Sequence, residues 1–185
     1  MSSYLADNRQ RLIELIGQIS VDKQPEGWSH VASIAVGGLL SVGFSEKGAY
    51  LLVVSSSGRS VIYCKTGEKI ERDYDEYAGL SELGLHCQGI GVIEDEVVSL
   101  CGINGGGLPL TNRAGEGLEV VSPEWPESHL ILCKPFKSAL IPGHQSDCKI
   151  IYTGYLRAYG FSWCGNYIAA ACGSDLDIWS RESEL

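Results

Sequence analysis

The histidines and cysteines are the residues of this chain best suited to metal binding or nucleophilic catalysis. There are four histidines and seven cysteines, and the closest pairs are His86 with Cys87 and His144 with Cys148. Zinc usually takes four ligands from two closely spaced pairs, and the sequence contains neither Cys-x-x-Cys nor His-x-x-x-His. We therefore expect no metal site, and we expect most cysteines to act as small core residues.

The serine and glycine patterns differ from those of hydrolases and phosphate-binding loops. No Gly-x-Ser-x-Gly occurs, and His144, Ser146 and Asp147 lie in one short segment. Members of a catalytic triad usually come from separated parts of the chain. The glycine-rich residues 104–109 are not followed by the Lys-Ser/Thr pair of a phosphate loop. We therefore expect no catalytic residue and no cofactor.

Acidic residues are concentrated between residues 68 and 96, where nine acidic side chains accompany two basic ones. Acidic groups attract a basic partner, and interleaved tyrosines add rigid contact area with a polar tip. The alternatives are a solvated loop, or a strand edge that its charges keep soluble. The sequence predicts these partner-binding residues here: Glu71, Asp73, Tyr74, Asp75, Glu76, Tyr77, Glu94, Asp95 and Glu96.

A tryptophan in a later acidic loop is a further candidate contact. Trp125 lies between Pro123 and Pro126, which favour a rigid and partly exposed ring. Tryptophan is frequent at binding hot spots, so we add Trp125 to the predicted partner-binding residues. The alternative is a ring packed against the sheet as a lid.

An N-terminal helix is the first element that the pattern predicts, over residues 4 to about 20. Leu5, Leu12, Ile16 and Ile19 fall on one stripe of such a helix. An apolar stripe usually faces a core, so we favour a helix packed on the domain over a helix that binds a partner.

Short strands separated by Gly, Ser and Asn follow from Trp28 onward. A short helical turn is possible over residues 77–85. The predicted strands are 31–36, 39–44, 50–55, 60–64, 97–102, 118–121, 130–133, 138–141, 149–153, 156–161, 167–172 and 176–179.

An internal repeat organises these strands. Gly43-Phe44-Ser45-x-x-Gly48-x-Tyr50 recurs 117 residues later as Gly160-Phe161-Ser162-x-x-Gly165-x-Tyr167, and each copy continues into a strand, a turn and another strand. In each copy the second glycine suits a turn with positive φ, and the tyrosine opens the next strand.

This repeat resembles one blade of a WD40-like β-propeller, over residues 31–70 and 148–182. The resemblance and the repeat spacing imply a mainly β fold of antiparallel meanders. These meanders form a small propeller-like fold of about four blades, or a β-sandwich, with one N-terminal α-helix. We expect a single domain over residues 1–185, with the helix and a linker in 1–24 and the β domain in 28–182.

Charge and composition narrow the function further. The net charge is −9, which disfavours binding to duplex nucleic acid or to an anionic membrane and favours a basic protein partner. Seven cysteines without a disulfide-like spacing, and no signal peptide pattern, favour a reduced cytoplasmic protein.

In type and composition the chain resembles bacterial immunity proteins of polymorphic toxin and contact-dependent inhibition systems. The resemblance implies a non-catalytic protein that binds and neutralises a cognate toxin domain, such as a basic nuclease. The combined substitutions Asp73→Lys, Asp75→Lys and Glu76→Lys should then weaken binding to the toxin domain. The alternatives are a propeller-like scaffold or adaptor for host partners, and a hydrolase in which Cys, His and a carboxylate converge in one pocket.

Overall fold

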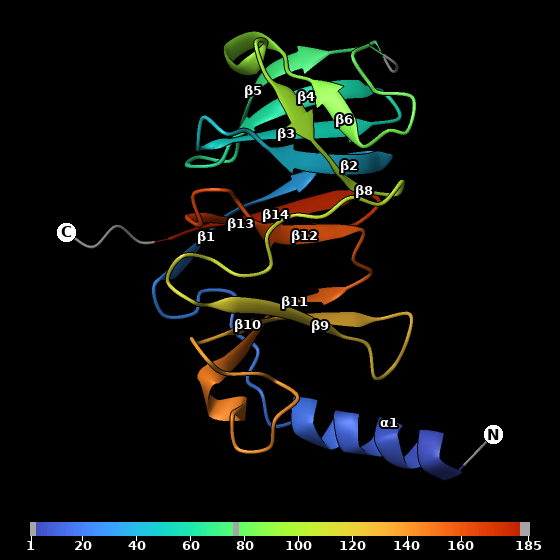
Figure 1. Ribbon diagram of the computed structural model, residues 1–185, viewed down its shortest axis with the longest axis vertical. Helices are drawn as coiled ribbons and strands as arrows, with labels where there is room; N and C mark the ends of the chain where they lie inside the picture. The colour runs from blue at the N-terminus through green and yellow to red at the C-terminus, as the bar shows by residue number, and fades with distance from the viewer. Residues whose placement is uncertain (1–2, 76–77, 182–185) are drawn as a thin grey trace. The chain divides into compact units, whose positions relative to one another are not determined.

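A mainly β chain with one N-terminal α-helix is seen in the computed structural model, which describes residues 3–75 and 78–181 (Figure 1). This confirms the predicted class at that level. The elements run α1 (Ser3–Ile16), β1 (Trp28–Ala35), β2 (Leu39–Phe44), β3 (Tyr50–Ser55), β4 (Gly58–Tyr63), β5 (Glu68–Asp73), β6 (His86–Gln88), η1 (Gly91–Ile93), β7 (Val97–Ser99), β8 (Cys101–Gly102), β9 (Gly117–Val121), β10 (Ser128–Cys133), η2 (Gln145–Asp147), β11 (Cys148–Gly154), β12 (Ala158–Phe161), β13 (Tyr167–Ala171) and β14 (Asp175–Arg181).

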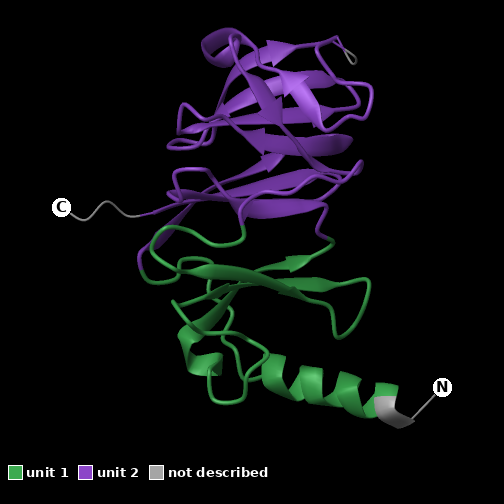
Figure 2. Ribbon diagram, viewed as in Figure 1, with its two compact units in different colours: residues 1–26, 110–155 green, residues 27–109, 156–185 purple. Residues whose placement is uncertain are grey.

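The chain divides into two compact units, each built from two separate stretches of sequence (Figure 2). Unit 1 comprises residues 1–26 and 110–155, and unit 2 comprises residues 27–109 and 156–185. The expectation of one folding domain over residues 1–185 stays a prediction.

The internal repeat corresponds to two three-stranded antiparallel meanders in unit 2. The first copy forms β2, β3 and β4, and the second forms β12, β13 and β14. Tyr50 and Tyr167 begin β3 and β13, as the pattern predicts. Each meander is extended by a fourth strand on the same side. β5 adds to β4 in the first sheet, and β1 adds to β14 in the second.

Pairing between distant strands corrects the boundaries that the sequence predicts for the two meanders. β1 pairs with β14 instead of joining the meander over residues 31–70. β11 pairs with β10 in unit 1, so the second meander begins at β12 and not at residue 148. A local pattern marks where strands start and end, but the partner of a strand depends on burial and on hydrogen bonds that only the fold provides.

The turn after each repeated serine has the same backbone geometry in both copies. The Ser45 N–H donates to Tyr50 O, and the Ser162 N–H donates to Tyr167 O, each over 2.9 Å. Gly48 and Gly165 have φ of 101° and 78°, which favours glycine over residues with a Cβ. The repeated sequence thus fixes a repeated turn.

The first sheet of unit 2 is covered on both faces. One face joins β2, β3 and β4 to β13 and β14 in a core that includes Phe44, Ile62 and Ile178. The other face packs Leu52 and Val61 against residues of β6, η1 and β7. A strand buried on both faces has a continuous apolar sequence, and this explains residues 51–54 of β3.

Unit 1 places the helix against a three-stranded sheet of order β11-β10-β9. Ile16 and Ile19 are buried in a cluster with Val121, Ile131 and Ile150. The packed helix that we favoured is therefore confirmed. Only its C-terminal half is buried, and Leu5 near its start is 56% exposed. The helix ends at Ile16, just before Gly17, and not near residue 20.

Three further local predictions are wrong. Residues 138–141 form a turn and not a strand, and the Gln145 amide donates to the carbonyls of Ala139 and Ile141 there. Described residues 78–85 contain no helix. β5 and β6 were not predicted, since β5 carries the alternating charges that a solvated loop also carries.

Candidate functional site

The predicted acidic residues fall into two groups on unit 2. Glu71, Asp73, Tyr74 and Asp75 lie at the end of β5 and just beyond it, where β5 forms the edge of its sheet. Glu94, Asp95 and Glu96 lie between η1 and β7. Glu76 and Tyr77 lie outside the described residues. The charged strand edge that we considered as an alternative therefore accounts for part of this segment.

Asp73 is engaged in a structural ion pair. Its Oδ2 accepts from Nε and Nη2 of Arg59 at 3.1 and 3.0 Å, and its Oδ1 accepts from the Asp75 N–H at 3.0 Å. The Asp75 N–H and then the Arg59 guanidinium lower the pKa of Asp73. Arg59 also donates to Gln88 O at 2.5 Å, so this pair connects β4 and β5 with β6.

Tyr74 and Asp75 are the most exposed described residues of the first group. Tyr74 is 79% exposed, and the Arg72 guanidinium lies over its ring at 4.9 Å from the centroid. The Asp75 carboxylate accepts from the Ala78 N–H at 3.1 Å. Glu71 is only half-exposed and lies against Gly91, where a Cβ on the glycine would meet its carboxyl carbon. Tyr74 and Asp75 are therefore the described side chains of this group that are most open to solvent.

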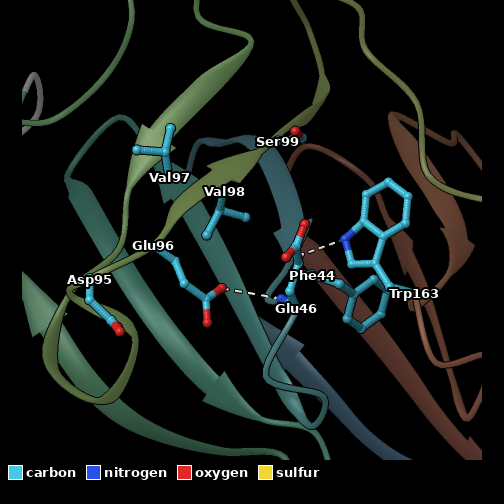
Figure 3. Close-up of a pocket in the computed structure, with 8 residues that line it drawn as sticks. All are labelled: Phe44, Glu46, Asp95, Glu96, Val97, Val98, Ser99 and Trp163. Atoms are coloured by element: carbon cyan, nitrogen blue, oxygen red, sulfur yellow. Dashed lines mark hydrogen bonds between the residues drawn. The ribbon is translucent and has the colours of Figure 1, made fainter.

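The second group is fastened to the first repeated turn. The Glu96 carboxylate accepts from Ser45 Oγ at 2.8 Å. It also accepts from the Glu46 N–H at 3.1 Å (Figure 3). Lys47 pairs with Asp95, and this hydrogen bond is the main cause that lowers the pKa of Asp95. The Glu94 side chain is exposed. The segment 94–96 therefore has a fixed position beside the turn.

A pocket of about 270 Å³ opens at this junction (Figure 3). Its walls come from the two repeated turns, from β7 and from the two residues that precede β7. Figure 3 shows Phe44 and Trp163 on one side of the pocket and Asp95 on the other. The lining residues are Phe44, Glu46, Asp95, Glu96, Val97, Val98, Ser99 and Trp163.

Glu46 and Trp163 are equivalent positions of the internal repeat, since each directly follows the repeated serine. The Trp163 indole N–H donates to Phe44 O at 3.0 Å, which fixes a ring that is 45% exposed. Among the described residues, the Glu46 carboxylate has no hydrogen-bond or ion-pair partner. Neither residue was predicted from the sequence, although both occupy the first of the two variable positions in the repeated turn.

The pocket combines negative charge with an aromatic wall. A carboxylate forms strong charge-assisted hydrogen bonds with a cation, and the face of an indole attracts one. The protein's own Lys47 illustrates the first preference, because its ammonium group binds Asp95 and the Val92 carbonyl at the edge of this segment. The arrangement suits a cationic group with a flat surface.

A Ser, His and Asp cluster elsewhere in unit 2 has a different geometry from a catalytic triad. Oδ1 of the buried Asp177 accepts from Ser33 Oγ and pairs with His30 Nε2 at 2.8 Å. In a triad the histidine lies between the serine and the aspartate, whereas here both contact the same oxygen. The His30 and Trp179 rings are packed nearly perpendicular with their centroids 5.2 Å apart, so the cluster joins β1 to β14.

Trp125, the remaining predicted contact, lies in unit 1. It is 81% exposed, so the alternative of a ring packed on the sheet is wrong. The preceding Pro123 carbonyl accepts from Arg9 Nε at 2.9 Å, which anchors this loop to α1. Trp125 is therefore available as a contact on its own unit.

Residues 3–75 and 78–181 contain neither a metal-binding cluster nor a membrane-spanning helix. No group of three or more His, Cys, Asp or Glu side chains in these ranges is placed to hold a metal ion. His144 instead accepts from the Ser138 N–H through Nδ1 at 3.3 Å. The described part of the chain has no helix long and apolar enough to cross a membrane.

No protein-family model and no curated protein matches this sequence. Functional inference therefore depends on the pocket, the exposed acidic loops and the repeat.

Proposed function

We propose that this chain is a non-catalytic protein-binding protein that docks a basic protein partner through the acidic surface of unit 2. The observation that carries the proposal is the pocket beside segment 94–96, where a Glu46 carboxylate without a partner among the described residues accompanies a fixed Trp163 ring. Tyr74, Asp75 and Glu94 provide further exposed contact groups on the same unit.

Electrostatics favour a basic partner at such a surface. Complementary charge accelerates association and excludes partners of like charge. Exposed carboxylates retain much of their hydration until contact, whereas the aromatic rings supply area with little loss of side-chain entropy. The acidic groups thus select and steer the partner, and Trp163 and Tyr74 serve as anchors.

More specifically, we propose that this protein-binding protein is an immunity protein, which neutralises a cognate bacterial toxin domain in the cytoplasm. A nuclease domain suits the role, because a surface that binds phosphate backbones carries lysines and arginines. An acidic protein covering that surface would exclude the nucleic-acid substrate. The overall charge of −9 supports this assignment.

The second candidate is a propeller-like scaffold or adaptor. The observation that favours it is the pair of equivalent meanders, each extended by a fourth strand as in a WD40-like blade, although β8 adds a fifth strand beside β2 in the first sheet. Under this proposal the sheets are blades of a small propeller-like fold, and the partner is a host protein without toxic activity.

Co-expression of the tagged full chain with the product of the adjacent upstream gene tests the first proposal. We expect a stoichiometric complex with a basic, growth-inhibiting domain, and we expect restored growth. The variant Glu82→Lys/Glu94→Lys reverses two exposed charges on unit 2. It should weaken the complex by about tenfold, mainly through slower association.

The matched control is Asp7→Lys/Glu14→Lys, which makes the same charge change on exposed positions of α1 in unit 1. This control should bind within about twofold of wild type. Equal binding by both variants would place the interface elsewhere. A partner that does not inhibit growth would favour the scaffold.

A further inference from the structure

We propose that the pocket between the two repeated turns receives an arginine side chain of the basic partner. The guanidinium stacks on Trp163 and pairs with the Glu46 carboxylate. This inference rests on the proposed function, which it deepens by naming the group that the pocket recognises.

The size of the pocket favours a single side chain. Its volume of about 270 Å³ lies below the range of about 300–1,000 Å³ that is typical of small-molecule sites. The lining contains carboxylates and apolar walls but no lysine or arginine. The three lining carboxylates disfavour an anionic or phosphorylated ligand and attract a cationic side chain, even though Lys47 partly neutralises Asp95.

The shape of the walls favours arginine over lysine. A guanidinium is planar, carries five N–H donors and stacks on aromatic faces, whereas an ammonium is a compact and strongly hydrated charge. The Trp163 indole N–H is already used by Phe44 O, so the ring offers its face and not its donor. A planar cation can contact this face and still donate to a carboxylate.

The acidic groups of the pocket have different roles. Glu96 is occupied by Ser45 and the Glu46 backbone, and Asp95 binds Lys47. These contacts hold the walls in place before a partner arrives. Glu46 keeps an exposed carboxylate without a partner among the described residues, so it can accept the incoming guanidinium.

The repeat explains how such a site could arise from a structural motif. The serine and glycine of each copy fix the same turn, which leaves the two residues between them free to vary. One copy has glutamate and the other tryptophan at the first of these positions. The conserved frame thus presents a charge and a ring to one pocket.

A peptide titration tests the pocket without the natural partner. The probe is acetyl-Gly-Arg-Gly-amide, followed by the NMR signal of the Trp163 indole N–H, which Trp163→Phe identifies. We expect saturable shifts with a Kd of roughly millimolar, as suits one side chain. The citrulline peptide, which is isosteric and neutral, should cause no saturable shift, and the lysine peptide should bind about threefold or more weakly.

Variants distinguish the pocket from general surface charge. Glu46→Gln should weaken binding of the arginine peptide by about tenfold, since it removes the ion pair and keeps the shape. Glu68→Gln removes the same charge from an exposed position on β5 and should bind within about twofold of wild type. Equal affinity for the arginine and citrulline peptides, or equal effects of both variants, would overturn the proposal.

The same variants separate this inference from the proposed function. A natural complex that tolerates Glu46→Gln and still weakens with Glu82→Lys/Glu94→Lys would refute the arginine site but retain the acidic interface. Arginine-peptide binding in a chain that takes no basic partner would refute the proposed function and retain the pocket's cation preference.

Discussion

At the scale of single residues, the acidic side chains of unit 2 differ in what each one contacts. Asp73 and Glu96 bind Arg59 and Ser45 and thereby hold strands and turns together. Glu46 and Glu94 are exposed and have no such contact among the described residues. The acidic side chains of unit 2 therefore have two uses, and only the exposed carboxylates of Glu46 and Glu94 are suited to binding a partner.

This division predicts a pH-dependent role for Asp73. Asp73→Asn should lower the free energy of unfolding at pH 7, because Arg59 would lose the carboxylate that it binds. The pKa of Asp73 is lowered in the folded protein, so its contribution is present above the ordinary value of 3.8 and is lost as the pH falls further. Chemical denaturation should show a smaller difference in the free energy of unfolding between wild type and Asp73→Asn at pH 3 than at pH 7.

The control for this prediction is Glu94→Gln, which removes the same charge from an exposed position. Its stability should equal that of wild type at both pH values. An Asp73→Asn protein as stable as wild type at pH 7 would contradict the structural role of the pair.

At the scale of elements, the repeated turn positions the pocket. Both copies have the same serine-to-tyrosine backbone hydrogen bond and a glycine with positive φ. They differ at the two intervening residues, which are Glu46-Lys47 in one copy and Trp163-Cys164 in the other. The positions that fix the backbone recur, whereas the first intervening position, which lines the pocket in both copies, differs between them.

The turn geometry predicts a specific cost for alanine at Gly48. A Cβ there meets no atom within 4 Å, so the effect of Gly48→Ala comes from its φ of +101° alone. We expect a loss of about 1–2 kcal/mol in the free energy of unfolding, measured by urea denaturation. Gly37→Ala also adds a Cβ in open space, but without positive φ, and should change stability by less than about 0.5 kcal/mol. Equal effects would contradict the proposed strain.

Local elements were predictable where the sequence is strongly patterned. Residues 39–44 and 50–55 match β2 and β3, because each is an apolar run bounded by turn residues. β5 was missed because five of its six residues are charged and it lies at the sheet edge. The pairing of β1 with β14 was not predictable, since it joins segments that are far apart in the chain.

The candidate site was predictable only in part for the same reason. The acidic composition of segment 68–96 pointed to Glu94, Asp95 and Glu96, which do lie at the pocket or beside it. Glu46 and Trp163 come from two other segments, and only their equivalence in the repeat connected them. The contact of Arg59 with Asp73 requires the pairing of β4 with β5, which the sequence analysis did not predict.

At the scale of the whole molecule, the net charge of −9 shapes association with any partner. A basic protein should approach quickly at low ionic strength, and its association should slow as salt screens the exposed carboxylates. The buried contacts of the complex should be less sensitive to salt. Under the proposed function, charge should govern the rate of encounter, and the aromatic anchors should govern the lifetime of the complex.

Hydrogen–deuterium exchange on the purified complex with the basic partner tests the acidic interface of unit 2 most directly. We expect slower amide exchange in residues 45–48, 74–75, 92–99 and 162–165 of unit 2 when the partner is bound. Protection confined to α1 and the loop around Trp125 in unit 1, with those segments unchanged, would contradict it.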